Sequence, residues 1–199
     1  MGQDKALVAL DGRPLIAHAL AVLQQAGLGA RIAGGRAELA EFAPVVEEFA
    51  PDRGPLGGIC AALAATEARR AVFLPVDLPL LPASLVVFLL ECARTTGRAI
   101  TVPSVNGFAQ SFPAVVDREA LPGLSSELEA GRGGCFAAFE AAAGRLGETV
   151  AVAPVEAAVQ SGHVAHAQGL AAARWFLNVN RPEDIVRAEA RLRAMHRVS

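Results

Sequence analysis

The sequence predicts an α/β protein, in which a doubly wound, mostly parallel sheet is flanked by helices. Short apolar runs alternate along the chain with longer segments whose apolar residues recur at helical spacing. One run, residues 71–76, is apolar throughout, which is typical of a strand buried on both faces of a parallel sheet. The chain has 199 residues, 53% hydrophobic and 19% charged, so it can bury a sizeable core.

In the first half of the chain, strands and helices are predicted from turn and capping residues and from the spacing of apolar residues. We expect a short strand at residues 7–10, which ends at the Asp11-Gly12 turn signal. Residues 15–25 place their apolar side chains near one helical face, with proline before the segment and glycine after it. The further predicted elements are strands at 30–33 and 44–49 and a helix at 55–66.

The second half continues the alternation of strands and helices. Residues 157–173 are rich in Ala, Gly and Gln and weakly patterned, so they form either a loop or a marginal helix. The predicted strands are 71–76, 99–103, 112–116, 149–153 and 175–179, and the predicted helices are 82–93, 118–129, 134–143 and 182–195. With no repeat, linker or low-complexity segment, residues 1–199 are expected to form a single domain.

Composition narrows the function classes. The formal net charge is −2, with 18 basic and 20 acidic residues, so no basic excess indicates a nucleic-acid partner. The longest apolar runs are interrupted before they could span a bilayer, and no secretory signal opens the chain, so a cytoplasmic protein is expected. The three cysteines lie far apart, which argues against a disulfide framework or a zinc site.

Asp77 is the first candidate for chemistry, because it follows the buried strand at 71–76. Ligands of doubly wound folds bind beyond the carboxyl ends of the strands. Pro75 and Pro79 hold this carboxylate in a fixed direction, which suits Mg²⁺ bound through one carboxylate and substrate phosphates. An aspartate that only shapes a turn or caps a helix is the alternative, and we favour metal binding.

Lys5 is the second candidate, because it is the only lysine in a chain whose other 17 basic residues are arginines. The ammonium of lysine is a compact point charge that can reach a phosphate, whereas the guanidinium of arginine is a planar fork, so the two are not interchangeable. An ordinary surface lysine is the alternative, and the scarcity of lysine makes it less attractive.

Two pairs of residues are ambiguous. Gly57 and Gly58 begin the predicted helix at 55–66, where they allow either the close approach of a ligand or tight helix packing. Asn180 can cap the final helix, with Pro182 and Glu183 after it. Capping does not account for Asn178, which lies inside an apolar predicted strand.

Three histidines and a glycine pair could be mistaken for catalytic, metal-binding or phosphate-binding residues, but their sequence context does not favour those roles. His18 lies on the apolar face of its helix and is expected to pack or cap there. The Gly34-Gly35 pair lacks the spacing of a phosphate loop, and His163 and His166 have no acidic or cysteine partner nearby in the sequence.

Four of these segments, taken in order, resemble the molybdenum cofactor guanylyltransferase family, within the wider group of α/β nucleotidyltransferases. The resemblance covers residues 1 to about 189 and implies a Rossmann-like fold of the nucleotide-diphospho-sugar transferase type. The motifs that carry it are MGQDKAL at 1–7, GPLGGICAAL at 54–63, PVDLPLLP at 75–82 and NVNRPED at 178–184.

The resemblance implies a reaction and its residues. The family transfers GMP from GTP to molybdopterin with Mg²⁺ and releases pyrophosphate. By likeness, Lys5 and Asp77 are catalytic and bind the nucleotide, and Asp77 also holds the metal. Glu47 stands where the family carries a nucleotide-binding acid, seven residues before the glycine of GPL. Gly57 and Gly58 would lie beside the nucleotide.

The implied partners extend beyond GTP. Asn178 and Asn180 would face the pterin. Molybdoenzymes or cofactor-delivery proteins are further partners, and neither nucleic acid nor membrane is implied.

The chain departs from the family at two places. The family opens with an apolar strand and an LAGGxSxR loop that cradles phosphates, and this sequence begins after that loop. It is therefore expected to be N-terminally truncated relative to the family, through an upstream start (which we favour), a decayed gene, or a fold in which another strand fills the gap. Ala33 stands where the family tends to place an asparagine that reads the nucleotide.

These departures keep two alternatives open. The chain could be a related nucleotidyltransferase that uses CTP or another nucleotide. It could also be a non-catalytic paralogue that binds a pterin or a partner protein, because the phosphate loop is absent.

Overall fold

The computed structural model describes residues 4–34, 37–47, 53–131 and 134–196, and the chain divides into two compact units. Unit 1 consists of residues 1–29, 74–88 and 154–199. Unit 2 consists of residues 30–73 and 89–153. The single domain expected from the sequence stays a prediction.

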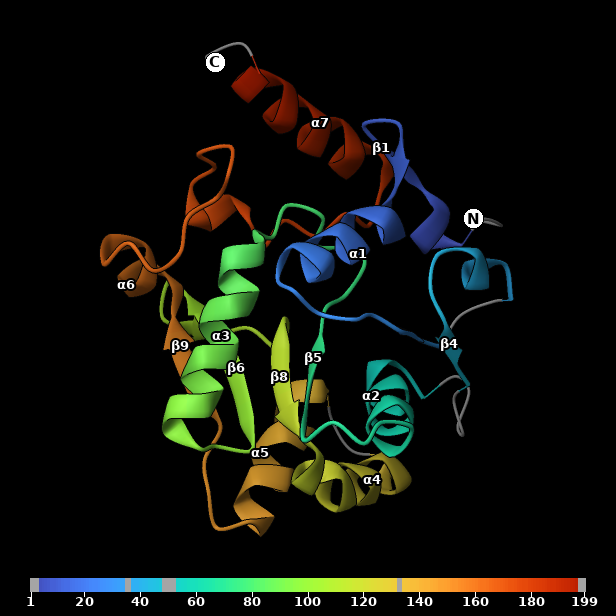
Figure 1. Cartoon of the computed structure of the whole chain (residues 1–199), viewed down its shortest axis with the longest axis vertical. Helices are drawn as coiled ribbons and strands as arrows, with labels where there is room; N and C mark the ends of the chain where they lie inside the picture. The colour runs from blue at the N-terminus through green and yellow to red at the C-terminus, as the bar shows by residue number, and fades with distance from the viewer. Residues whose placement is uncertain (1–3, 35–36, 48–52, 132–133, 197–199) are drawn as a thin grey trace. The chain divides into compact units, whose positions relative to one another are not determined.

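Unit 2 contains a five-stranded sheet (Figure 1). Its path is β5-β8-β6-β7, and β9 pairs with β6. The strands are β5 (Arg70–Phe73), β6 (Ile100–Val105), β7 (Phe108–Ala109), β8 (Ala114–Asp117) and β9 (Ala151–Pro154). Helices precede and follow these strands along the chain, which confirms the predicted α/β class.

The expectation of a mostly parallel sheet is wrong for this sheet. β8 runs antiparallel to both of its neighbours, β5 and β6, and β7 runs antiparallel to β6. Because β8 is antiparallel to each of them, β5 and β6 are parallel to one another, as the crossover through α3 (Ala83–Thr96) requires. β8, which comes later in the sequence, lies between β5 and β6 in the sheet. The alternation of strands and helices along the sequence does not predict this order.

A second, two-stranded sheet in unit 2 is parallel. β3 (Ile32–Ala33) pairs with β4 (Val45–Val46) in the register Ile32 to Val45. Both strands fall inside the predicted ranges, but each is only two residues long. A 3₁₀ turn, η2 (Ala37–Glu41), lies between them and was not expected.

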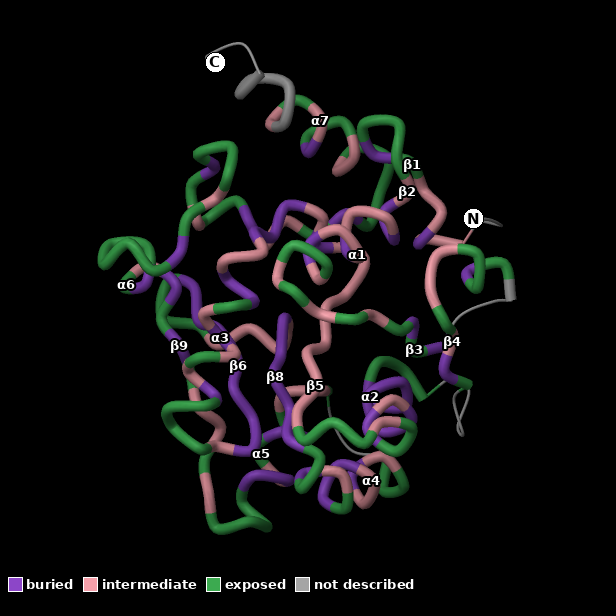
Figure 2. Tube along the Cα trace, viewed as in Figure 1, coloured by how far each residue is buried: buried purple, intermediate pink, exposed green. Residues whose placement is uncertain are grey.

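Three helices share one hydrophobic core with β6 and β8 in unit 2. They are α2 (Pro55–Ala64), α4 (Leu121–Ala130) and α5 (Cys135–Arg145). The core side chains of each strand alternate along it, so they lie on one face of the sheet. β6 and β8 are buried along their whole length, whereas β5 is half-buried (Figure 2).

Unit 1 contains a hairpin whose turn was predicted at Asp11-Gly12, although its returning strand was not. β1 (Ala9–Leu10) pairs antiparallel with β2 (Arg13–Pro14). Asp11 and Gly12 have φ angles of 49° and 74°, the left-handed conformation of both central residues in a type I′ turn. The confirmed helix α1 (Leu15–Gln25) follows directly.

In the rest of unit 1, the strand predicted at 175–179 is wrong. Residues 175–179 form no strand; a 3₁₀ turn, η4 (Ala172–Arg174), leads into Trp175, whose indole N–H donates to the carbonyl of Leu170 at 2.7 Å. The apolar run here is a buried anchor in a loop, and periodicity does not distinguish the two. Helices α6 (Val155–Gln160) and α7 (Pro182–His196) complete the unit, and α6 falls partly in the weakly patterned stretch.

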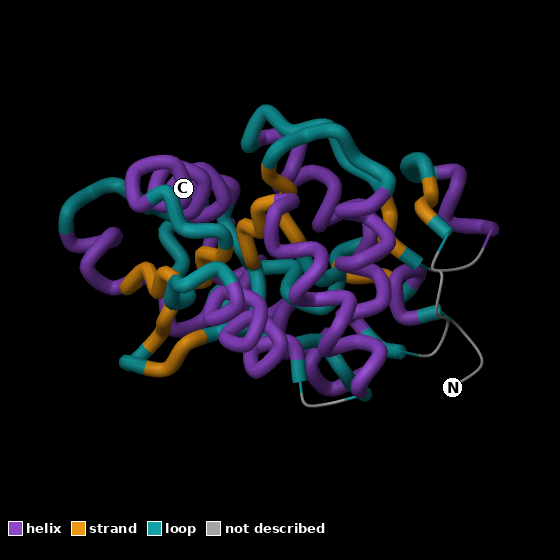
Figure 3. The backbone as a smooth tube through the Cα atoms, turned by 90° about the horizontal axis from the view of Figure 1, so that it is seen from below, coloured by secondary structure: helices purple, strands orange, loops and turns teal. Residues whose placement is uncertain are grey.

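Within the described ranges, no helix is long and apolar enough to cross a membrane. The strands are short pieces between longer helices and loops (Figure 3).

Candidate active site

Three residues far apart in the sequence meet in unit 1. The Lys5 ammonium donates a hydrogen bond to Asp77 Oδ2, with 2.9 Å between Nζ and the oxygen. The same ammonium donates to Asn180 Oδ1. An ammonium, a carboxylate and an amide are therefore held together at one place.

Local backbone geometry places Lys5. It opens the 3₁₀ turn η1 (Lys5–Leu7), whose cap is Asp4: the Asp4 carboxylate accepts from the N–H of Ala6 at 2.9 Å. Ala6 is buried. The buried alanine and the capped turn fix the backbone, so the half-exposed lysine side chain extends from a defined position.

Asp77 is placed by the loop that follows β5. Leu78, Leu80 and Leu81 are all buried after it, which anchors this loop. The carbonyl of Asp77 accepts from the N–H of Val179 at 2.9 Å. That backbone bond ties the loop to the segment that carries Asn180.

Asn180 does not cap the final helix with its side chain, because that side chain faces Lys5. Asp184 closes the helix start instead: its Oδ2 accepts from the N–H of Asn180 at 3.1 Å and from the N–H of Arg181 at 3.0 Å. The bond from the Asn180 N–H is the main cause that lowers the pKa of Asp184.

The site can exchange its internal ion pair for a ligand. The side chains of Lys5 and Asp77 are 38% and 25% exposed, so water reaches both. Ion pairs at such exposure stabilise a fold by only about 0.2–1 kcal/mol. A polyanion at Lys5 and a cation at Asp77 can therefore replace the pair at small cost.

The residues present fit a magnesium ion that arrives with a phosphate substrate. Within the part of the chain that the structure describes, no group of three or more His, Cys, Asp or Glu side chains could cage a metal. Mg²⁺ is commonly held by one or two carboxylates together with substrate phosphates and water. The Asp77 carboxylate offers that kind of anchorage.

The comparison with protein families decides the classification. Residues 1–176 match the family described as MobA-like NTP transferase domain. The chain belongs to this family. The resemblance seen in the four sequence motifs is thereby confirmed.

Several relatives of the MobA-like chain are named molybdenum cofactor guanylyltransferases. The one from Xanthomonas euvesicatoria is 47% identical over 45% of this chain and 47% of its own length. The one from Vibrio cholerae is 32% identical over 65% of each chain. A probable one from Haloferax mediterranei is 30% identical over 92% of this chain and 84% of its own length. The chain thus spans 47% and 65% of the lengths of the first two relatives, less than two thirds of each.

Solved structures support the same fold. The molybdopterin-guanine dinucleotide biosynthesis protein A of Archaeoglobus fulgidus has a TM-score of 0.74 at 20% identity, covering 97% of this chain and 92% of that one. The 2-C-methyl-D-erythritol 4-phosphate cytidylyltransferase of Thermus thermophilus has a TM-score of 0.67 at 18% identity, over 95% and 94%. The α/β nucleotidyltransferase fold of the MobA-like chain is established by these likenesses.

The remaining predicted site residues are distributed over both units. Asn178, in unit 1, is exposed. Glu47 is exposed after β4, and Gly57 and Gly58 are buried in the first turns of α2, all in unit 2. Burial of the two glycines favours close packing, and their place beside a nucleotide stays a prediction. Ala33 is exposed in β3.

His18 contacts a backbone carbonyl, as its packing or capping prediction requires, whereas His163 is exposed. His18 Nε2 lies 2.9 Å from the Leu10 carbonyl. His163 and His166 lie near the rings of Phe88 and Trp175 in unit 1. Of the Gly34-Gly35 pair, Gly34 is buried and Gly35 lies outside the described residues.

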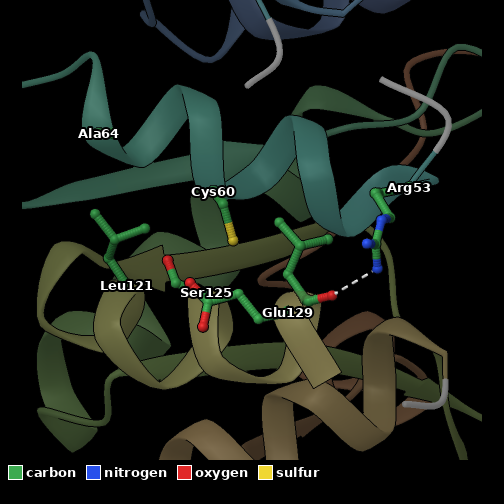
Figure 4. Close-up of a pocket in the computed structure, with 7 residues that line it drawn as sticks. Arg53, Cys60, Ala64, Leu121, Ser125 and Glu129 are labelled. Carbon is green, nitrogen blue, oxygen red and sulfur yellow. Dashed lines mark hydrogen bonds between the residues drawn. The ribbon is translucent and has the colours of Figure 1, made fainter. Parts of the chain in front are cut away.

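Unit 2 also holds a surface pocket of about 390 Å³ between α2 and α4 (Figure 4). Cys60 and Ser125 face one another across it, and Arg53 donates to the Leu128 carbonyl at its rim at 3.2 Å. Burial raises the pKa of the Cys60 thiol, which keeps it protonated and unreactive at neutral pH.

Sequence reasoning missed Asp184. Glu183 was chosen because it stands three residues after Asn180. The helix begins one residue later than that spacing assumed, with Arg181 before Pro182, so the acid at the third helical position is Asp184. The sequence feature that could have indicated Asp184 is its place as the second acidic residue of the PED motif at 182–184.

Proposed function

We propose that this chain transfers GMP from GTP to molybdopterin and releases pyrophosphate. The contact between the Lys5 ammonium and the Asp77 carboxylate supports the proposal, because nucleotidyl transfer needs a cation for the phosphates and an anchor for Mg²⁺. Membership of the MobA-like family supports the choice of substrates.

The reaction asks mainly for positioning and charge stabilisation. An oxygen of the pterin's terminal phosphate forms a bond to the α-phosphorus of GTP. The bond from that phosphorus to the oxygen that bridges to the β-phosphate breaks, and pyrophosphate leaves with that electron pair. Bound Mg²⁺ neutralises charge on the phosphates.

The chain's own residues take distinct parts in this scheme. Lys5 leaves Asp77 and neutralises phosphate charge, which grows on the leaving group. Asp77, freed from Lys5, would hold Mg²⁺. Asn178 and Asn180 bind the pterin, and Glu47, Gly57 and Gly58 bind the nucleotide. We place the protein in the cytoplasm, where molybdoenzymes or delivery proteins would receive the product.

Pyrophosphate release tests the proposal. Purified protein is incubated with GTP, Mg²⁺ and molybdopterin, and pyrophosphate is measured with and without the pterin. Asp77→Ala is expected to lose turnover while its circular dichroism spectrum stays native. Glu91→Gln, which removes an exposed carboxylate on α3, serves as the matched control and is expected to keep it. Unchanged turnover in Asp77→Ala would refute the metal role.

Ala33 favours a second candidate, a transferase for CTP or another nucleotide, because this exposed residue offers no amide to read a base. Parallel assays with GTP, CTP, ATP and UTP distinguish the two. A clear preference for CTP would replace the first proposal. Binding of molybdopterin with no binding of any nucleotide would instead identify a non-catalytic paralogue.

A further inference from the structure

The Lys5 site is held by a continuous series of contacts that ends outside it, at Asp184. The Asp184 carboxylate accepts from the backbone N–H groups of Asn180 and Arg181. The Asn180 side chain accepts from Lys5, and Lys5 contacts Asp77. Each link is a hydrogen bond or an ion pair, and all five residues belong to unit 1.

We propose that Asp184 is a positioning residue, which orients Asn180 so that its amide oxygen holds the Lys5 ammonium in the site. One carboxylate oxygen receives two successive backbone N–H groups, which fixes the peptide planes on both sides of the Asn180 Cα atom. The direction in which the Asn180 side chain leaves the backbone is set by those planes.

The charges around Asp184 are consistent with this fixed role. Arg187, one turn along α7, brings Nη1 to 3.7 Å from Asp184 Oδ1. The Asp184 side chain is only 17% exposed, and its pKa is lowered mainly by the Asn180 N–H. The carboxylate is therefore ionised at neutral pH and oriented from two sides.

The same contacts have a simpler explanation, in which Asp184 only caps α7. A cap stabilises the helix without affecting Lys5. A positioning residue affects the Lys5 amine itself, so the test must measure that amine directly.

The composition of the chain makes that measurement clean, because Lys5 is the only lysine. The full chain is acylated briefly with an amine-reactive ester, and tandem mass spectrometry separates modification at Lys5 from that at the α-amino group. Asp184→Ala is expected to raise the acylation rate of Lys5 about two- to five-fold, since one hydrogen bond to a half-exposed ammonium is lost. Acylation needs no nucleotide, so its result is independent of the proposed reaction.

A double-mutant cycle separates positioning from general loosening. Asn180→Ala removes the acceptor directly and is expected to raise the rate as much as Asp184→Ala does. The double variant is expected to show no further rise, because both changes break the same link. If the double variant showed the combined increase of the two single variants in the acylation rate of Lys5, the proposal would be overturned.

Two neighbouring variants complete the test. Glu183→Gln removes the adjacent first-turn carboxylate and is expected to leave the Lys5 rate unchanged. Asp184→Glu is expected to keep the wild-type rate, because a glutamate at this helical position also reaches back to the cap. A rise in Glu183→Gln equal to that in Asp184→Ala would assign the effect to charge alone and reject the positioning role.

The remaining outcomes also decide the question. A lower thermal midpoint for Asp184→Ala with an unchanged Lys5 rate would show that Asp184 only caps the helix. If Asp184→Ala does not fold, Asp184→Asn replaces it with a smaller expected rise, and no rise in that variant would overturn the proposal. The proposal rests on the proposed function only for the importance of Lys5.

Discussion

At the scale of single residues, the site depends on an ammonium group that has two partners within one unit. Lys5 contacts a carboxylate that follows a strand and an amide that precedes a helix. During the proposed reaction the ammonium must exchange its contact with Asp77 for phosphates, and the partial exposure of that ion pair keeps the free-energy cost small.

Lys5→Met is expected to lower kcat by about 100- to 1000-fold, the range typical of removing one preorganised group that stabilises transition-state charge. Pyrophosphate release measures the loss. Arg94→Met on α3 removes an exposed cation of similar length and is expected to keep full activity. Equal loss in both variants would show that net charge, and not the Lys5 site, governs turnover.

The three thiols are expected to react slowly with an alkylating reagent at pH 7. Burial is the main cause that raises the pKa of Cys60, Cys92 and Cys135, so the thiolate fraction of each is small. The alkylation rate, followed by mass spectrometry, is expected to rise with pH and to increase sharply in urea. Fast alkylation of native Cys60 at pH 7 would contradict the buried environment.

At the scale of elements, α4 and α5 pack so closely that one position requires glycine. A Cβ atom on Gly123 would lie 2.9 Å from both the Cα and Cβ atoms of Ala142. Both residues are buried, so the helices would have to move apart to admit a methyl group.

Gly123→Ala is therefore expected to destabilise the protein by about 1–3 kcal/mol, the usual cost of an overpacked contact. Gly144→Ala in α5 is the matched control, because a Cβ atom there meets nothing within 4 Å. The control is expected to be neutral or stabilising by about 0.5–1 kcal/mol, as alanine favours helix. Urea denaturation measures both, and equal effects would contradict this packing.

Because Asp184 at the start of α7 is ionised, the free energy of unfolding is expected to fall at acidic pH. The folded-state pKa of Asp184 lies below its ordinary value of 3.8, so its contribution is fully present above that value. The contribution is lost as pH falls through the lower, folded-state pKa. The difference in unfolding free energy between wild type and Asp184→Asn is therefore expected to shrink between pH 6 and pH 3. A difference independent of pH would contradict the ionised cap.

At the scale of the whole molecule, the chain crosses between its two units four times, and α3 contributes residues to both. The single-domain prediction therefore implies one cooperative unfolding transition. Trp175, the only tryptophan, is buried in unit 1, and Phe139 is buried in the core of unit 2.

Phe139→Ala is expected to lower the unfolding free energy by about 3–5 kcal/mol, as is usual for a buried aromatic side chain. If the chain is one domain, Trp175 fluorescence and far-ultraviolet circular dichroism are expected to shift together. A fluorescence transition that stays at its wild-type midpoint would show that unit 1 unfolds alone.

Local patterns predicted most elements because helices and turns depend on neighbouring residues. Proline before 15–25 located the start of α1, and the Asp11-Gly12 signal located the turn of the hairpin. The strand expected at 175–179 failed because a buried tryptophan in a loop carries the same apolar signal. The insertion of β8 between β5 and β6 was hidden because pairing order is a long-range property.

The sequence by itself determined the α/β class and the family motifs, and it selected as candidates a single lysine and an aspartate that follows an apolar run. Tertiary structure alone decided that Lys5, Asp77 and Asn180 meet, that the Asn180 side chain faces the lysine and that Asp184 closes α7. The physical reason is range: caps and periodicity act over a few residues, whereas Lys5 meets partners 72 and 175 positions away, which only the folded chain brings within hydrogen-bonding distance.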